Sequence, residues 1–318
     1  MIGELMIFSG NANIPLAEAI AEKAGVELGK VDIMKFSNEN IKVAYRDSVR
    51  GKDVFIIQPS CVPVNDGLME LLIMIHAARH ASAARITAVT PYYPYVRSDK
   101  KDEKRISITA KLVADLLEAA GADRVMAVNL HSPQIQGFFN MPCDHLLAGK
   151  IMCDACVRIN NNDLSGGVVI APDAGSAKHA RHYAKSLGLP MAILDKRRTD
   201  DSECAEMDNI IGDVNGKRAF IFDDEVASGG SLIEAATLLQ KNGVKDIQAY
   251  CVHGVLSGKA VERIANSPIQ KLVITDTVYI PPEKRHEKLE IISVAELFAN
   301  AIVYTNSDRS ISGLYDRF

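Results

Sequence analysis

The chain has 318 residues, 47% of them hydrophobic, and a formal net charge of −4 at pH 7. This size supports two domains with ordinary cores, while the charge argues against a nucleic-acid-binding protein. No apolar run approaches the roughly 18 residues of a membrane span, and the start, MIGELMIFSGN, lacks signal-peptide features. With six scattered cysteines, which suit a reducing compartment, we expect a cytoplasmic protein.

Short β-branched runs alternate with longer amphipathic segments along the chain. In chain order, strands are predicted at residues 4–8, 54–58, 85–89, 124–128, 168–171, 191–194, 219–222, 247–252 and 271–275. Helices are predicted at 15–24, 68–80, 108–120, 177–187 and 231–243, and the segment LLAGKIMCDACVRI also has helical periodicity. This alternation is typical of α/β folds with mainly parallel sheets. Several strands are apolar throughout, as strands buried on both faces are.

The two halves of the chain resemble each other. VRGKDVFII at 49–57 matches VNGKRAFIF at 214–222, and each glycine is followed 16 or 17 residues later by Leu-Met-Glu or Leu-Ile-Glu at the opening of a helix. We therefore expect an α/β fold of two similar, duplicated domains, each a mainly parallel sheet flanked by helices. The boundary is predicted at residues 1–148 and 149–318. Chance similarity of two generic α/β units is the alternative.

Two acidic residues and a loop of small residues follow the strand at 219–222. Asp223 and Asp224 stand at its carboxyl end, where open α/β sheets bind ligands. The carboxylates suit sugar hydroxyls or a bridging magnesium ion, and small residues before a helix let backbone N–H groups approach a phosphate. The segment therefore predicts a sugar-phosphate site, against an ordinary turn with an acidic N-cap. The loop comprises Ala227, Ser228, Gly229, Gly230 and Ser231.

Further charged groups follow other predicted strands. Asp173, with Lys178 one turn later, could hold a diphosphate or its metal ion, although Asp-Ala-Gly is also a common turn. His131 could contact a metal-bound triphosphate, although a lone histidine is usually structural. In DKRR, Lys196 and Arg198 could neutralise charge that develops during phosphoryl transfer.

The loop RSDKKDEKR at 97–105 is long and charged. The guanidinium of Arg97 could stack on a flat base, and the basic residues Lys100, Lys101, Lys104 and Arg105 could close over phosphates. A solvated surface loop is an equally good interpretation of this run.

Taken together, these motifs resemble the ribose-phosphate diphosphokinases, or PRPP synthetases, and more widely the type I phosphoribosyltransferases. The matching segments are KFSNEN, VRGKDVFIIQ, NDGLMELLIMI, RSDKKDEKR, LHSPQIQGFF, PDAGSAK, DKRR, DDEVASGGSL and HGVLSGKA. The resemblance implies transfer of the β,γ-diphosphoryl group of ATP to the 1-hydroxyl of ribose 5-phosphate, which gives PRPP and AMP. It also implies a Mg²⁺ cofactor and a homo-oligomer built from dimers, commonly a hexamer.

The resemblance also assigns roles to individual residues. It implies catalytic roles for Lys196, Arg198, Lys101 and Arg105, and a metal site with His131 and Asp173. Ribose 5-phosphate would be bound by the carboxylates and small residues at 223–231. The N-terminal domain would hold ATP, partly at a subunit interface, through Phe36, Asn38, Asn40, Arg97, Ser98, Asp99, Lys100 and His131.

The chain departs from the family pattern at a few positions. Asn129 and Asn140 stand where the family usually has Asp, Asn40 where it has Glu, and Pro133 replaces a regulatory Ser. The loop at 227–231 also carries an additional glycine. Two alternatives therefore stay open: the same chemistry on a larger ribose 5-phosphoryl acceptor, and a non-catalytic regulatory subunit.

Overall fold

The computed structural model describes residues 3–196 and 207–314. The chain divides into two compact units. The first comprises Met1–Ala148, Thr277–Tyr279 and Ser293–Asp316, and the second comprises Gly149–Asp276, Ile280–Ile292 and the last two residues.

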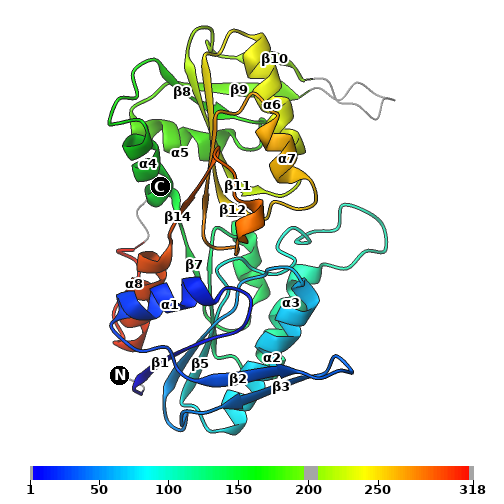
Figure 1. The fold of residues 1–318 in the computed structure, drawn as a ribbon, viewed down its shortest axis with the longest axis vertical. Helices are drawn as coiled ribbons and strands as arrows, with labels where there is room; N and C mark the ends of the chain where they lie inside the picture. The colour runs from blue at the N-terminus through cyan, green and yellow to red at the C-terminus, as the bar shows by residue number, and fades with distance from the viewer. Residues whose placement is uncertain (1–2, 197–206, 315–318) are drawn as a thin grey trace. The chain divides into compact units, whose positions relative to one another are not determined.

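The first unit is a parallel sheet between two helical layers. Its strands lie in the order β1-β4-β5-β6-β7: β1 (Leu5–Ser9), β4 (Asp53–Ile57), β5 (Arg85–Val89), β6 (Arg124–Val128) and β7 (Cys143–Leu146). One face carries α1 (Ile14–Ala24) and α8 (Ala295–Asn306), and the other carries α2 (Val64–His80) and α3 (Thr109–Ala120) (Figure 1). The short helix η1 (Pro133–Phe138) follows β6, and β2 (Val31–Lys35) and β3 (Ile41–Tyr45) form a separate antiparallel ribbon.

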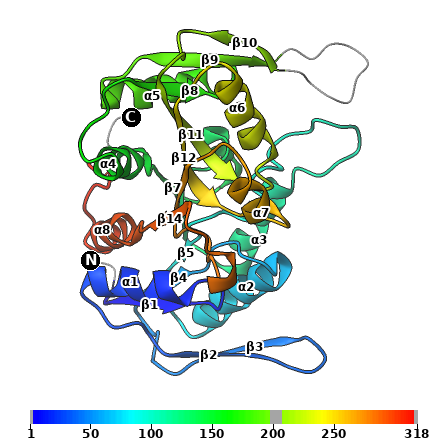
Figure 2. The same ribbon diagram turned by 45° about the horizontal axis from the view of Figure 1, so that its top comes forward.

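The second unit repeats this arrangement. Its strands lie in the order β10-β9-β8-β11-β12-β13-β14: β8 (Gly167–Ala171), β9 (Met191–Lys196), β10 (Met207–Ile211), β11 (Arg218–Val226), β12 (Asp246–Gly254), β13 (Lys271–Thr275) and β14 (Leu289–Ile292). The helices α4 (Gly149–Ile159) and α5 (Ala177–Leu187) pack together, as do α6 (Gly230–Lys241) and α7 (Ala260–Ala265) (Figure 2). A short helix, η2 (Pro282–Lys284), precedes β14.

The strand order confirms the duplicated α/β fold predicted from the sequence. The order β1-β4-β5-β6-β7 in one sheet corresponds strand for strand to β8-β11-β12-β13-β14 in the other. The matching segments VRGKDVFII and VNGKRAFIF contain β4 and β11, which occupy the same place in the two sheets. The antiparallel pairs also correspond. Along the chain, β2–β3 comes between β1 and β4, and β9–β10 comes between β8 and β11.

The last helix of each repeat belongs to the other compact unit. Helix α4 follows β7 of the first sheet but packs on α5 in the second unit, and α8 follows β14 of the second sheet but packs on α1 in the first unit. The division expected from the sequence, 1–148 and 149–318, therefore differs from the compact units at residues 277–279 and 293–316. The sequence repeats place α4 with the first half of the chain and α8 with the second half. The packing places each of these helices in the other unit.

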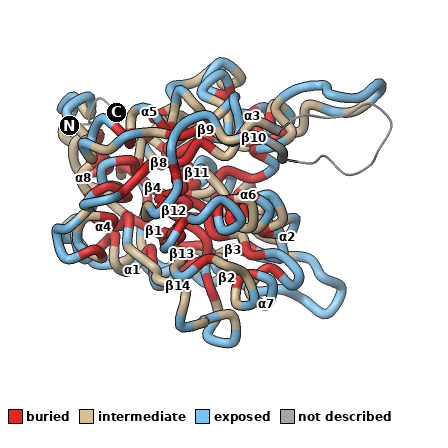
Figure 3. Tube along the Cα trace, turned by 90° about the horizontal axis from the view of Figure 1, so that it is seen from above, coloured by how far each residue is buried: buried red, intermediate tan, exposed pale blue. Residues whose placement is uncertain are grey.

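Both sheets have apolar, buried centres (Figure 3). Every residue of β4 and of β8 is buried, because helices cover both faces of a parallel sheet. The strands β2, β3, β7, β10 and β14, which the sequence analysis did not predict, lie at sheet edges or in the separate ribbon. In the described ranges, no helix combines the length and the apolar character needed to cross a bilayer.

A buried ion pair ties α8 to the first sheet. The carboxylate of Asp53, which is fully buried, accepts hydrogen bonds from Arg85 Nε at 2.8 Å and Nη2 at 2.5 Å. Asn306, at the end of α8, donates from Nδ2 to the same carboxylate at 2.9 Å, and Arg85 Nη2 also donates to the carbonyl of Thr305 at 3.0 Å. Strands β4 and β5 are thus joined to α8 through one charged network.

We predict that Arg85→Leu lowers the free energy of unfolding by about 3 kcal/mol, because it leaves the Asp53 carboxylate buried without its cation. Arg79→Leu is the matched control, since Arg79 forms an exposed pair with Asp123 at 3.5 Å and such pairs contribute under about 1 kcal/mol. Urea unfolding followed by circular dichroism measures both variants. Equal effects of the two substitutions would contradict the role assigned to the buried pair.

Candidate functional site

In the second unit, three neighbouring parallel strands bring the predicted charged residues to one edge. Strands β9, β8 and β11 lie side by side and run in the same direction, so their carboxyl ends meet at the same edge of the sheet. Lys196 is the last residue of β9, Asp173 follows β8, and Asp223 lies toward the end of β11. Arg198 lies outside the described residues.

The carboxylate pair lies within a strand rather than after it. The predicted strand at 219–222 extends to Val226, with Asp223 paired to Cys251 and Glu225 to His253 of β12. Burial, and then the negative charge of Asp224, raise the pKa of Asp223 to about 7. The negative charges of Asp173 and Glu225 contribute smaller parts of this rise in the pKa. This end of β11 thus gathers negative charge that a cation or a hydrogen-bond donor would stabilise.

The loop of small residues after β11 is short. Helix α6 begins at Gly230, so Ser231 lies in its first turn rather than in the loop. Gly229 is the N-cap, with a left-handed φ of 76°, a conformation that favours glycine. Its carbonyl accepts the N–H of Ile233 at 3.0 Å, and the carbonyl of Ala227 accepts the N–H of Ser257 at 3.0 Å. Helix α6 therefore begins close to the acidic end of β11. The N–H groups and partial positive charge at a helix N-terminus favour an anion.

The loop after β8 is held by its own side chains. The N–H of Ser176 donates to Asp173 Oδ1 at 2.7 Å, and Ser176 Oγ donates to the Asp173 carbonyl at 2.8 Å. The next helix brings His179, which the sequence analysis missed, to within 3.8 Å of Asp224, measured from Nδ1 to Oδ1. Lys178, the residue predicted from the sequence, is the neighbour of His179 on α5. To find His179 from the sequence, one would need to know which face of α5 is turned toward β11. The sequence alone does not give that orientation.

In the first unit, the candidate nucleotide residues follow neighbouring strands. The 97–105 loop follows β5 and His131 follows β6, and these two strands pair in parallel. Ser98 anchors the loop to the next helix, because its Oγ accepts the N–H of Thr109 at 3.2 Å and its carbonyl accepts that of Ala110 at 3.1 Å. The basic residues Lys100, Lys101, Lys104 and Arg105, together with Arg97 and His131, are exposed, and Asp99 is half-buried.

The other candidate nucleotide residues lie at the tip of the β2–β3 ribbon. Phe36 is 46% exposed, and its N–H donates to the carbonyl of Asn40 at 2.8 Å. Asn38 Oδ1 in turn accepts the N–H of Asn40 at 3.2 Å. The first turn of α2 contacts both candidate segments. Its Asp66 pairs with Lys35 at 2.8 Å, and its Asn65 accepts the hydroxyl of Tyr95 just before the charged loop.

Two departures from the family pattern have structural uses. Asn129 is buried, with φ of 42°, and its Oδ1 accepts the N–H of Ala148 at 2.8 Å. Asn140 donates from Nδ2 to Glu118 at 2.8 Å, a bond that an ionised aspartate could not make because it has no donor. At these two positions the amide groups thus support the local structure.

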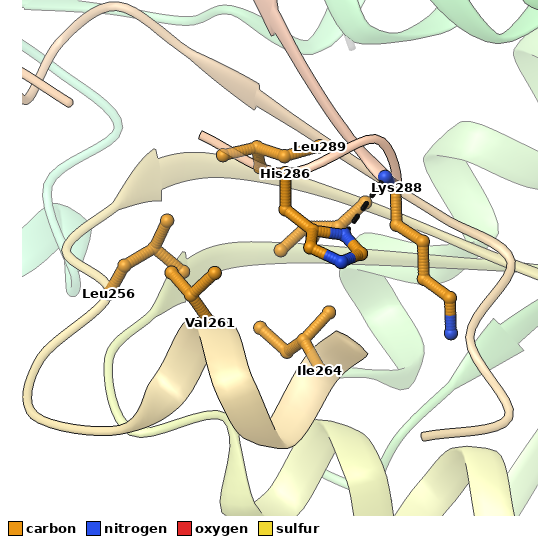
Figure 4. A pocket seen from close by; sticks show the side chains of 7 residues that line it. Leu256, Val261, Ile264, His286, Lys288 and Leu289 are labelled. Atoms are coloured by element: carbon orange, nitrogen blue, oxygen red, sulfur yellow. Dashed lines mark hydrogen bonds between the residues drawn. The ribbon is translucent and has the colours of Figure 1, made fainter. Parts of the chain in front are cut away.

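The cavities among the described residues include one of about 650 Å³ between α6 and α7, a ligand-sized one in the first unit and a small apolar one in the second. A cavity of about 300 Å³ lies at the carboxyl ends of β1 and β4, next to the first turn of α2, and its lining includes Asn11, Gln58, Cys61, Glu70 and Tyr279. Figure 4 shows the smaller one, which Leu256, Val261, Ile264 and Leu289 line with His286 and Lys288 beside them. Its volume of about 10 Å³ is that of about one water molecule, so it cannot hold a sugar phosphate.

The described side chains form no closed metal cage. Within the described ranges, no group of three or more His, Cys, Asp or Glu side chains is arranged to hold a metal ion. The carboxylates near the end of β11 could supply one or two oxygen ligands, which is how proteins usually bind Mg²⁺ together with substrate phosphates.

We predict that Asp223→Asn stabilises the protein at pH 8. The folded-state pKa of about 7 lies above the unfolded value of about 3.9, so the folded state retains a proton that the unfolded state loses. Stability from this group is complete below about pH 4 and is lost as the pH rises through 7. Thermal midpoints of the variant and the wild type should therefore agree at pH 4 and separate at pH 8. The exposed Asp154, changed to Asn, is the control. Equal midpoints at pH 8 would contradict the raised pKa.

We predict opposite effects for alanine at two adjacent glycines. Gly229→Ala should lower the free energy of unfolding by about 1 kcal/mol, because alanine disfavours the left-handed backbone; the added Cβ itself meets ordinary contacts at 3.5 Å. Gly230→Ala, at the first position of α6 with its nearest contact at 3.7 Å, should be neutral or stabilising. Urea unfolding compares the two, and equal destabilisation would reject the special role of Gly229.

Comparisons with known proteins find the same family in both halves of the chain. Residues 5–121 match the N-terminal domain of ribose phosphate pyrophosphokinase, and residues 202–316 match the phosphoribosyl synthetase-associated domain. The chain is 50% identical over 311 residues to the ribose-phosphate pyrophosphokinase of Caldanaerobacter subterraneus subsp. tengcongensis, with 98% of each chain covered. It is 47% identical over 317 residues to that of Deinococcus radiodurans, again with 98% of each covered.

A solved structure extends the likeness to the fold. The phosphoribosylpyrophosphate synthetase from Mycobacterium smegmatis superposes with a TM-score of 0.90 at 40% identity, covering 96% of this chain and 99% of that one. Because the likeness covers nearly all of both repeats, the chain belongs to the ribose-phosphate pyrophosphokinase family.

Proposed function

We propose that the chain transfers the β,γ-diphosphoryl group of ATP to the 1-hydroxyl of ribose 5-phosphate and releases PRPP and AMP. The observation that carries the proposal is the edge of the second sheet, where two carboxylates precede a glycine-capped helix in a chain that matches its relatives over nearly its full length. The attacking sugar oxygen and the departing AMP oxygen must lie in line through the β-phosphorus, so catalysis rests on positioning and charge neutralisation.

Ribose 5-phosphate would span the end of β11 and the start of α6. Asp223 and Asp224 would accept hydrogen bonds from the ribose hydroxyls. The 5-phosphate would lie at the backbone N–H groups of residues 227–231, where the left-handed Gly229 turns the chain into the helix. The hydroxyls of Ser228 and Ser231 would add two donors, so that one short segment recognises both ends of the sugar phosphate.

The acidic residues near this site fit a Mg²⁺ cofactor. Asp173 and Asp224 both raise the pKa of Asp223, so these carboxylates lie close enough to repel one another, and oxygen ligands suit Mg²⁺. Asp173 is the candidate metal ligand in the second unit, and His131 is the candidate metal ligand in the first unit. When bound, the ion supplies positive charge to the diphosphate oxygens.

The first unit would hold ATP and supply cations. Phe36, Asn38 and Asn40 would bind the adenine from the tip of the ribbon, across a subunit interface, while Arg97, Ser98, Asp99 and Lys100 would bind ATP from the 97–105 loop. Lys101 and Arg105 in the loop, with Lys196 at the end of β9 and Arg198 two positions later in the sequence, would neutralise the charge of the transferred group. The N-terminal domain would thus be the nucleotide domain and the C-terminal domain the sugar-phosphate domain.

We further propose a cytoplasmic homo-oligomer built from dimers, with a hexamer as the expected form. The exposed Phe36 supports this proposal, because a large aromatic side chain at a ribbon tip is typical of a residue that packs on a partner. Sedimentation equilibrium measures the assembly.

Free ribose 5-phosphate is the proposed acceptor. The full-length relatives do not favour a larger acceptor or a non-catalytic subunit, and the amide groups of Asn129 and Asn140 have structural partners. Turnover compared between ribose 5-phosphate and nucleoside-diphosphate riboses distinguishes the acceptors.

We predict that the protein forms AMP and PRPP from ATP, Mg²⁺ and ribose 5-phosphate, and that Lys196→Ala lowers kcat by about 100-fold or more, because it removes a cation from the transition state. Chromatographic quantification of AMP and PRPP measures both. Lys185→Ala, on the last turn of α5, is the control and should keep full activity. Absence of AMP formation by the wild type at any Mg²⁺ concentration would overturn the proposed function.

A further inference from the structure

A pair of histidines lies near the C-terminal end of α2, and the proposed reaction assigns no role to them. His76 and His80 are both exposed, and they are four residues apart on one helix, so their side chains share a face. Their ring centroids lie 4.3 Å apart, with the planes inclined at 44°. The reaction proposed above uses neither ring.

We propose that His76 and His80 form a surface site for a divalent transition-metal ion of the Zn²⁺, Ni²⁺ or Cu²⁺ class. Two imidazole nitrogens that bind one ion at 2.0–2.1 Å lie about 3 Å from each other. Rings whose centroids are 4.3 Å apart need only small rotations about their side-chain bonds to reach that spacing. Imidazole suits these ions, whereas Mg²⁺ prefers oxygen ligands, so the site would be distinct from the Mg²⁺ of the reaction.

The position of the pair on the helix favours a cation. His80 is the last residue of α2, and the unpaired carbonyl groups of a helix end carry partial negative charge. The neighbouring Arg79 does not occupy the site, because its guanidinium pairs with Asp123 at 3.5 Å. Since the two protein ligands leave the remaining coordination positions to water, the site is open.

The chain offers a matched comparison. His179 and His182 lie three residues apart on α5, and His179 is directed toward Asp224 at 3.8 Å. This second pair therefore tests whether any two histidines on a helix suffice, or whether the i, i+4 pair in ring contact is required.

Calorimetric titration of the intact protein with NiCl₂ or ZnCl₂, in buffer that contains excess Mg²⁺, tests the proposal. We expect one site per chain that Mg²⁺ does not displace, because imidazole nitrogen suits these transition-metal ions and Mg²⁺ prefers oxygen ligands. His76→Gln and His80→Gln should each weaken binding about 100-fold, since either change removes the chelate and leaves a single imidazole. His182→Gln should bind as the wild type does.

Thermal unfolding gives a second readout. Ni²⁺ should raise the midpoint of the wild type and of His182→Gln, because it binds the folded helix, but not that of His76→Gln or His80→Gln. The circular dichroism of every variant in the absence of metal should match the wild type. The proposal is overturned if the wild type shows no Mg²⁺-resistant site, if both α2 variants retain the wild-type affinity, or if His182→Gln is the variant that loses binding.

Discussion

Burial of both faces of a parallel sheet is the constraint on which the rest of this structure depends. Because helices cover both faces, the middle of each strand must be apolar, as β4 and β8 are throughout. Polar side chains are then confined to strand ends, and parallel strands place all their carboxyl ends on one edge. Residues separated by tens of positions, such as Asp173 and Asp223, are thereby brought to a common edge without any direct signal between them in the sequence.

The two repeats use this edge in opposite ways. Gln58 occupies in the first repeat the place of Asp223 in the second, and it is satisfied internally. Its Nε2 donates to Glu70 Oε1 at 2.7 Å and to the carbonyl of Gly67 at 3.1 Å, while Asn11 donates its N–H to Glu70 at 2.6 Å. The packing is close, since a Cβ on Gly10 would lie 2.3 Å from Gln58 Oε1. The polar groups at this strand end thus bond to one another, beside the cavity of about 300 Å³ that they help to line.

The end of β11 instead carries adjacent carboxyl groups. Asp223 and Asp224 are adjacent acids, and the raised pKa of Asp223 reflects both its burial and their repulsion. Such an arrangement costs stability in the absence of a partner, as functional sites often do. Duplication thus supplied two equivalent strand ends, of which one became a closed hydrogen-bond network and the other kept charge that a ligand can satisfy.

The sequence predicts the central strands and the main helices, because these carry strong apolar periodicity. It also predicts the loops after β8 and β11, because they hold unusual clusters of charged or small residues. It does not predict the strands β7 and β14, whose edge positions need less apolar character, nor the ribbon β2–β3, which packs on α2 rather than inside a sheet. It also misplaces the end of β11, because acidic residues are disfavoured in strands and mark a loop by composition. His179 could not be predicted as a site residue, because only its distance to Asp224 in the folded chain marks it as one.

The exchange of α4 and α8 between the units also could not be predicted from the sequence, because it depends on tertiary contacts. In each repeat the final helix follows an equivalent edge strand. The periodicity of that helix therefore does not indicate whether it will pack on α1 or on α5, the first helix of the other repeat. The choice is made by tertiary contacts such as those of Asn306, whose amide reaches the buried Asp53 and the carbonyl of Gly3. Each unit therefore completes its core with a helix encoded at the end of the other repeat. Each repeat thus carries a complete pattern of strands, while its last helix packs in the other compact unit.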